Sequence, residues 1–337
     1  MGGRVVRRGI EERNMDGERR GDRSPRGARS SALRAAALVW AAGAALQAGP
    51  PDRGAARAQD APGSFRAWLP IGLVAAPLSV GAPPTAPPAS SPTPSPTPAL
   101  SAAGCPEAAS YNAAAGGVSL YVLRDGAPVC ADYPNGGAPE AAWPLASGTK
   151  SFSGVMAAAA IEDGILSGWD ERIADTLVEW AEDPRKSRIT LRQLLGLVSG
   201  LDAGAVGSVP TYAEAVAAPA VAEPGTRFDY GPVPFQVFGE LMRRRLEGRY
   251  DDPLAYLRAR ILEPIGAEPA AWRRGTDGMP RLPSGASFTA AEWAVFGDLI
   301  RQHGRWNGRQ LVRADLLAEA FKGSTTRPTY GLTWWLL

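Results

Sequence analysis

Residues 147–150 of the sequence read Ser-Gly-Thr-Lys, a serine followed three positions later by a lysine. On a helix these positions share a face, so the lysine amine can reach the serine hydroxyl. A desolvated lysine can take a proton from a hydroxyl, whereas arginine stays charged. Among 36 basic residues, the lysines are Lys150, Lys186 and Lys322. Ser147 and Lys150 are therefore a candidate nucleophile and base.

The sequence around this pair is more informative than the pair itself, because Ser-x-x-Lys arises by chance in about one such chain in five. An alanine-rich apolar run continues to Ile161, and Asp163-Gly164 follows as a helix stop. Further along the chain, residues 189–195 read ITLRQLL and residues 199–201 read SGL. The run predicts a buried helix over 147–163 that carries the serine at its amino-terminal end, where developing negative charge is favoured.

This succession of segments closely resembles the serine β-lactamase-related family, which comprises class C β-lactamases, D-alanyl-D-alanine peptidases and related esterases. The resemblance runs from about Gly117 to the carboxyl terminus. It implies a serine hydrolase that forms an acyl-enzyme through its Ser-x-x-Lys nucleophile and acts on small esters, β-lactams or D-amino-acid peptides. The expected partner is a small acyl substrate, and the family chemistry needs no cofactor.

The family also carries a Tyr-x-Asn motif on a loop that faces the serine. Residues 223–230 read EPGTRFDY and match the approach to that motif, which makes Tyr230 the candidate that relays the serine proton. The alternative to a catalytic role for Tyr230 is a structural one, as an aromatic ring packed in the core. The family asparagine is replaced by Pro232, which offers no side-chain amide to a substrate. This departure favours esters over β-lactams and peptides.

A second departure concerns the family's third motif, which lies on a strand after a Tyr-Gly-x-x-Trp-Trp segment. That segment is present at residues 330–335, and the sequence given ends at Leu337. We therefore expect a chain truncated before the third motif, without one oxyanion-hole donor, a loss that costs about a hundred- to a thousand-fold in rate. The alternative to an active hydrolase is a catalytically inactive relative or a gene fragment.

Other chemistries find little support in the sequence. His303 is the one histidine, and we expect it exposed in the last turn of a helix. No Gly-x-Ser-x-Gly elbow accompanies it, and two distant cysteines complete no metal site. The acid pairs Glu182-Asp183 and Asp251-Asp252 each precede a proline, which is typical of a solvated turn or helix start.

Charge and composition divide the chain into three parts. Residues 1–82 combine an Arg- and Gly-rich start with two short apolar runs, and we interpret them as a targeting or disordered region. Residues 83–104 form a Pro/Ser/Thr-rich linker, and residues 105–337 form the hydrolase domain. The whole chain carries +2 and residues 1–66 carry +6, which leaves −4 on the rest and argues against nucleic acid. We expect a periplasmic or secreted protein without a stable membrane span.

Two cysteines, Cys105 and Cys130, fit an exported protein, in which a disulfide is the default. Two unpaired thiols stay open as the alternative, because two cysteines carry no spacing signature.

The expected fold class is α/β (α+β), an incomplete antiparallel sheet flanked by helices with a mostly helical insert at about 150–300, as in β-lactamases and transpeptidases. Residues 117–124 and 127–133 predict a hairpin around an Asp125-Gly126 turn. Apolar periodicity predicts helices at 147–163, 189–198, 235–247, 254–262 and 289–302.

Overall fold

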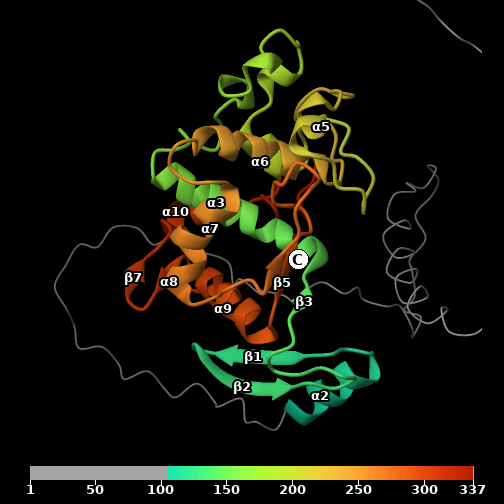
Figure 1. Ribbon diagram of the computed structural model, residues 1–337, viewed down its shortest axis with the longest axis vertical. Helices are drawn as coiled ribbons and strands as arrows, with labels where there is room; N and C mark the ends of the chain where they lie inside the picture. The colour runs from blue at the N-terminus through green and yellow to red at the C-terminus, as the bar shows by residue number, and fades with distance from the viewer. Residues whose placement is uncertain (1–104, 337) are drawn as a thin grey trace, which may run out of the picture. The chain divides into compact units, whose positions relative to one another are not determined.

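Helices and short antiparallel strands make up residues 105–336, the part of the chain that the computed structural model describes (Figure 1). The α-helices are α2 (Cys105–Ala114), α3 (Lys150–Glu162), α4 (Leu191–Leu195), α5 (Tyr212–Ala217), α6 (Val233–Arg245), α7 (Pro253–Leu257), α8 (Glu263–Ile265), α9 (Ala290–Arg301) and α10 (Ala314–Glu319). The strands are β1 (Leu120–Arg124), β2 (Ala127–Asp132), β3 (Trp143–Pro144), β4 (Ala271–Trp272), β5 (Ala286–Phe288), β6 (Arg305–Trp306) and β7 (Arg309–Gln310). A 3-10 turn, Ala146–Thr149, leads directly into α3, and a π turn, Arg258–Leu262, joins α7 to α8.

The described strands form three small antiparallel sheets. The hairpin β1–β2 is one sheet, β3–β5–β4 is the second and β6–β7 is the third. In the second sheet, Trp143 pairs with Phe288 and Trp272 pairs with Ala286, so segments far apart in sequence meet on the short strand β5. This sheet matters most for function, because β3 ends just before Ser147.

Helix α3 runs through the centre of the helices, between α6 and α10 (Figure 1). Every residue from Lys150 to Ala160 is buried. Its alanines and Gly154 let neighbouring segments approach closely: a Cβ added at Gly154 would lie 2.8 Å from the Leu332 carbonyl oxygen and 2.7 Å from the Thr333 hydroxyl oxygen. The small residues of α3 thus admit the carboxyl-terminal segment to the core.

An aromatic cluster joins α3 to the second sheet and to α9. The ring of Phe152 lies 5.3 Å from that of Phe288 on β5 and 4.4 Å from that of Phe296 on α9. Trp272 and Trp293 also pack against Phe152, with ring centroids 5.5 and 5.6 Å away. These tryptophans contribute to core packing, and the cluster fixes α3 relative to β5.

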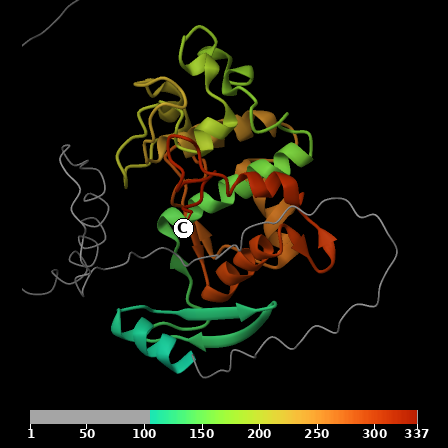
Figure 2. The ribbon, with the colours of Figure 1, turned by 180° about the vertical axis from the view of Figure 1, so that it is seen from behind.

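The predicted hairpin is present, and its turn has the expected geometry. Asp125 and Gly126 both have positive φ angles, 49° and 81°, as a type I′ turn requires. The register shifts between Val122 and Leu123, which marks a β-bulge. Helix α9 packs on strand β1, as the views from both sides show (Figure 2).

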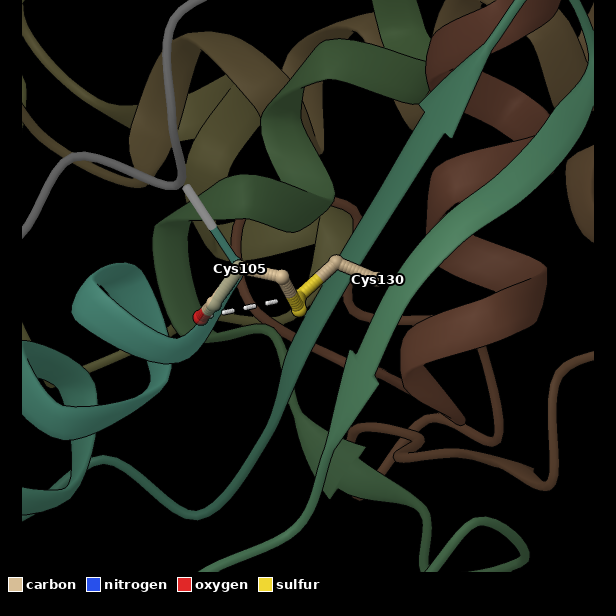
Figure 3. Close-up of a disulfide and its surroundings, with 2 residues drawn as sticks. All are labelled: Cys105 and Cys130. Carbon is tan, nitrogen blue, oxygen red and sulfur yellow. Dashed lines mark hydrogen bonds between the residues drawn. A yellow bond between two sulfur atoms is a disulfide. The ribbon is translucent and has the colours of Figure 1, made fainter. Parts of the chain in front are cut away.

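A disulfide joins Cys105 at the start of α2 to Cys130 on β2 (Figure 3). The two Cα atoms lie 5.7 Å apart, within the usual range for a disulfide. The pairing confirms the disulfide and excludes the two free thiols. Helix α2 itself was not predicted, and the structure shows it lying against β1 and β2.

The predicted fold class is confirmed, with two differences in detail. The described strands do not form the one antiparallel sheet that was expected, because β1–β2 and β3–β5–β4 are separate sheets. The predicted helix over 254–262 is present, but its second half is a π turn that follows α7, and Asp252 caps its start by accepting the Ala255 amide at 2.9 Å. The expectations for residues 1–104, including the targeting region and linker, lie outside the described residues. None of the helices within residues 105–336 has the length and apolar character that crossing a membrane requires.

Candidate active site

Ser147 lies in the 3-10 turn between β3 and α3, where its side chain is exposed. Two contacts fix this turn against β5: the Leu145 amide donates to the Ala286 carbonyl at 2.9 Å, and the Ala286 amide donates to the Thr149 hydroxyl at 3.2 Å. Ala146 has a φ of 46°, a conformation that costs energy for a residue with a Cβ. The anchored turn presents Ser147 at the start of a helix, where backbone N–H groups lack acceptors within the helix.

Lys150 lies one helical turn after Ser147 and is only 5% exposed. Its Nζ donates to the Ser147 Oγ at 3.1 Å and to the Pro283 carbonyl at 2.9 Å. Burial lowers the pKa of the Lys150 amine to about 7. The rings of Tyr230 and Phe235, with centroids 5.1 and 5.2 Å from Nζ, favour the charged form, but desolvation outweighs them. Near neutral pH the amine is therefore divided between its two protonation states.

Tyr230 lies beside the same amine, on the loop before α6. The loop is held by the Gly225 amide, which donates to the Val198 carbonyl at 2.7 Å, and by the Asp229 amide, which donates to the Leu197 carbonyl at 2.9 Å. Burial raises the pKa of the Tyr230 phenol, and hydrogen bonding with the Ser147 and Trp335 side chains acts in the opposite direction. The phenol thus stays protonated at neutral pH and is a proton donor. The structure brings the three predicted residues together.

Pro232, at the position of the family asparagine, is buried and immediately precedes α6. Its ring approaches Gly204, where an added Cβ would lie 3.6 Å from the proline Cγ. Gly231 is packed more tightly still, because a Cβ there would lie 2.1 Å from the Ala203 carbonyl oxygen. Pro232 therefore has a packing role and presents no amide toward Ser147.

Sequence reasoning missed two contributors to this site. The Pro283 carbonyl holds the lysine amine, and a backbone acceptor has no residue-type signature that could have identified it. Trp335 was noted only as part of a motif, yet its ring lies 5.7 Å from that of Tyr230 and 5.0 Å from that of Tyr330. The paired tryptophans of the Tyr-Gly-x-x-Trp-Trp segment were the available signal.

The other polar residues considered from the sequence lie elsewhere. His303 is exposed, as expected, but it follows α9 with a φ of 53° and is not in the last helical turn. Asp252 does start a helix, but it is buried and paired with Arg274 at 2.6 Å, which corrects the solvated position expected for it. Asp183 accepts the backbone amides of Arg185 and Lys186. Across residues 105–336, no group of three or more His, Cys, Asp and Glu side chains could hold a metal ion.

Comparison with known protein families identifies the class to which this chain belongs. The family model of the beta-lactamases matches residues 106–337. The chain therefore belongs to the beta-lactamase family. No curated protein sequence matches the chain at a significant level.

Solved structures share the fold at low sequence identity. A Bacteroides dorei DSM 17855 protein assigned as a beta-lactamase has a TM-score of 0.59 and 19% identity, over 69% of this chain and 78% of its own. EstCE1, a hydrolase with promiscuous acyltransferase activity, has a TM-score of 0.54 and 16% identity, over 69% of this chain and 82% of its own. A Bacillus anthracis protein assigned as a 6-aminohexanoate-dimer hydrolase has a TM-score of 0.54 and 18% identity, over 64% of each chain. The match thus spans less than two thirds of the last protein's length.

Proposed function

We propose that this protein is a serine hydrolase in which Ser147 is the nucleophile, Lys150 the general base and Tyr230 the proton donor. The observation that best supports this proposal is the 3.1 Å contact between the Lys150 amine and the Ser147 hydroxyl. Burial lowers the pKa of this lysine to about 7. Membership of the beta-lactamase family and the likeness in fold to hydrolases support the same reaction class.

The proposed reaction begins with neutral Lys150, which accepts the Ser147 proton while Oγ attacks the acyl carbon of the substrate. The Pro283 carbonyl holds one amine N–H and so directs the lone pair toward the serine. As the tetrahedral intermediate collapses, Tyr230 gives a proton to the leaving group and is reprotonated from Lys150. In the second half-reaction, water attacks the acyl-enzyme, its proton passes to the same pair of side chains, and Ser147 regains its own.

The substrate class that we favour is small esters. An asparagine at position 232 would offer an amide to a peptide-like substrate, whereas Pro232 is buried against the Gly204 backbone and has no side-chain donor. An ester needs no such contact to be attacked. β-Lactams and D-amino-acid peptides stay as competing substrates that the labelling experiment distinguishes.

The test is covalent labelling with a fluorophosphonate and, in parallel, with a fluorescent penicillin. We expect fluorophosphonate labelling that vanishes in Ser147→Ala and falls at least about a hundred-fold in rate in Lys150→Arg, because arginine cannot accept the proton. The labelling rate of the native protein should rise with pH, with a midpoint near 7, as Lys150 loses its proton. Lys322→Arg, at an exposed lysine, serves as the matched control.

Retained labelling in Ser147→Ala or Lys150→Arg would rule out this mechanism. Labelling by the penicillin as well as the fluorophosphonate would contradict the ester preference. An absence of labelling by both probes in the folded native protein would identify a catalytically inactive relative.

We also propose that the protein is exported to the periplasm or secreted. The Cys105–Cys130 disulfide supports this location, since disulfides persist mainly in oxidising compartments. Cell fractionation and mass spectrometry of the isolated protein test it. Full-length cytoplasmic protein with two reduced thiols would overturn the proposal.

A further inference from the structure

Arg327 carries a positive charge that no acidic side chain within residues 105–336 pairs with. Its guanidinium lies over the rings of Phe228 and Trp335, 5.1 and 5.5 Å from their centroids. Its Nε is buried without a hydrogen-bond partner, while the residue as a whole is partly exposed. The guanidinium of Arg327 thus has no anionic partner among the described residues, and the side chain keeps some exposure to solvent.

The neighbouring charges of this region are satisfied. Arg227 pairs with Asp229 at 2.8 Å, and Arg185 and Arg188 both pair with Glu223. A partly buried guanidinium without an anion is costly unless a ligand supplies one. Arg327 therefore differs from the arginines around it in having capacity for an external anion.

The position of Arg327 relates it directly to the candidate active site. The Trp335 ring on which it stacks lies 5.7 Å from the Tyr230 ring, and that ring in turn lies 5.1 Å from the Lys150 Nζ. Trp335 is 38% exposed and Ser147 is exposed as well. A cation thus contacts the Trp335 ring, which neighbours the Tyr230 ring beside Lys150.

The segment that carries Arg327 is anchored to the loop of Tyr230. The Thr326 hydroxyl donates to the Gly225 carbonyl, the Arg327 amide donates to the Ser324 hydroxyl at 2.9 Å, and the Tyr330 amide donates to the Arg327 carbonyl at 3.1 Å. Stacking on two rings further restricts the guanidinium plane. Little side-chain entropy remains to be lost when it binds a planar anion.

We propose that Arg327 binds a carboxylate on the substrate, so that the preferred substrates are esters with a free carboxylate several bonds from the scissile carbonyl. The inference rests on the proposed function of Ser147. A guanidinium fork matches a carboxylate through two parallel hydrogen bonds. A phosphate is disfavoured, because Arg227, the guanidinium on the neighbouring Tyr230 loop, is already paired with Asp229.

The test measures binding apart from turnover, in full-length Ser147→Ala protein that cannot form an acyl-enzyme. Ligand-detected NMR titrations compare monomethyl adipate and monomethyl suberate with the corresponding dimethyl esters, which lack the carboxylate. We expect the better monoester to bind at least about ten-fold more tightly than its diester, the discrimination typical of hydrogen bonds to a charged group. Adding Arg327→Gln should remove this preference, and adding Arg327→Lys should retain part of it.

Arg309→Gln, an exposed arginine on β7, is the matched control and should keep the full preference. Circular dichroism melts establish that each variant is folded, and Arg327→Lys keeps the charge if Arg327→Gln is unstable. Equal affinity for monoester and diester, or a preference that survives Arg327→Gln, would overturn the proposal. Fluorophosphonate labelling of native Ser147 is a separate measurement, so a failed serine mechanism is distinguishable from a failed carboxylate site.

Discussion

At the scale of single residues, the burial that lowers the pKa of Lys150 also reduces folding stability, because it disfavours the charged amine. Lys150 as a residue is 5% exposed, and the pKa of its amine falls to about 7 because burial disfavours the charged form. A lysine in the unfolded chain has a pKa near 10.4. Between these values the unfolded state binds more protons than the folded state, and folding stability consequently rises with pH.

We expect Lys150→Met to stabilise the protein at neutral pH, because methionine fills a similar volume without charge. Relative to wild type, the gain should fall by roughly 4 kcal/mol between pH 7 and pH 10, as the folded-state amine of the native protein becomes neutral. Urea unfolding at several pH values measures this difference, and other titrating groups cancel in the comparison. Lys322→Met is the control. A pH-independent difference would show that Lys150 is not desolvated.

Some residues of the candidate site could be predicted from the sequence and others could not. Ser147, Lys150 and Tyr230 could be predicted as candidates because their residue types, spacing and flanking segments are characteristic. The Pro283 carbonyl and the Arg327 guanidinium were not, because the first is a backbone atom and the second depends on ring stacking between segments far apart in the chain.

At the scale of elements, α3 depends on a glycine that a helix would otherwise disfavour. Gly154 sits where a methyl group would press on the Leu332 carbonyl and the Thr333 hydroxyl. Thr333 has a φ of 78°, so its segment already carries backbone strain at this contact. The fit positions the segment that continues to Trp335.

We expect Gly154→Ala to destabilise the protein by about 1–3 kcal/mol through overpacking, despite the better helix propensity of alanine. Gly297 on α9 is the matched control, because a Cβ there meets nothing within 4 Å. Gly297→Ala should stabilise by up to about 1 kcal/mol. Thermal and urea unfolding give both values. Stabilisation by both substitutions would show that the Leu332 contact is not close.

Local patterns predicted elements better than their pairing. The hairpin has its turn signal in Asp125-Gly126, and α9 has its capping box in Thr289 and Glu292. The strands β3, β4 and β5 have two or three residues each and pair across long stretches of chain, so no local periodicity reveals them. Their stability comes from tertiary packing around Phe152.

At the scale of the whole molecule, the disulfide and the site lie in different parts of the described chain. Cys105 and Cys130 fasten α2 to the β1–β2 hairpin, whereas Ser147 is anchored to β5. Helix α2 has no buried residue of its own, so apolar burial adds little to its attachment. The disulfide attaches the start of α2, and the Asn135 side-chain amide, which donates to the Ala113 carbonyl at 2.9 Å, attaches its end.

We expect the double variant Cys105→Ala/Cys130→Ala to lose about 3–4 kcal/mol in the chain-entropy account of a disulfide that closes a 25-residue separation. Hydrogen exchange should increase first in α2 and β2, while α3 keeps its protection. Fluorophosphonate labelling of Ser147 should continue in the variant at a temperature where it remains folded. Simultaneous loss of protection in α2 and α3 would show that the two parts unfold as one unit.

The anchoring of the Lys150 amine to Pro283 also has a consequence for the order of synthesis. Ser147 and Lys150 leave the ribosome early, but the carbonyl that holds the amine and the strand that anchors the serine turn come more than a hundred residues later. Until that later stretch has been made and packed, the lysine is an ordinary solvated ammonium and the serine an ordinary alcohol. On the proposed mechanism, a nascent or unfolded chain is therefore unreactive, and Ser147 becomes a nucleophile only after residues 283–286 have packed against its turn.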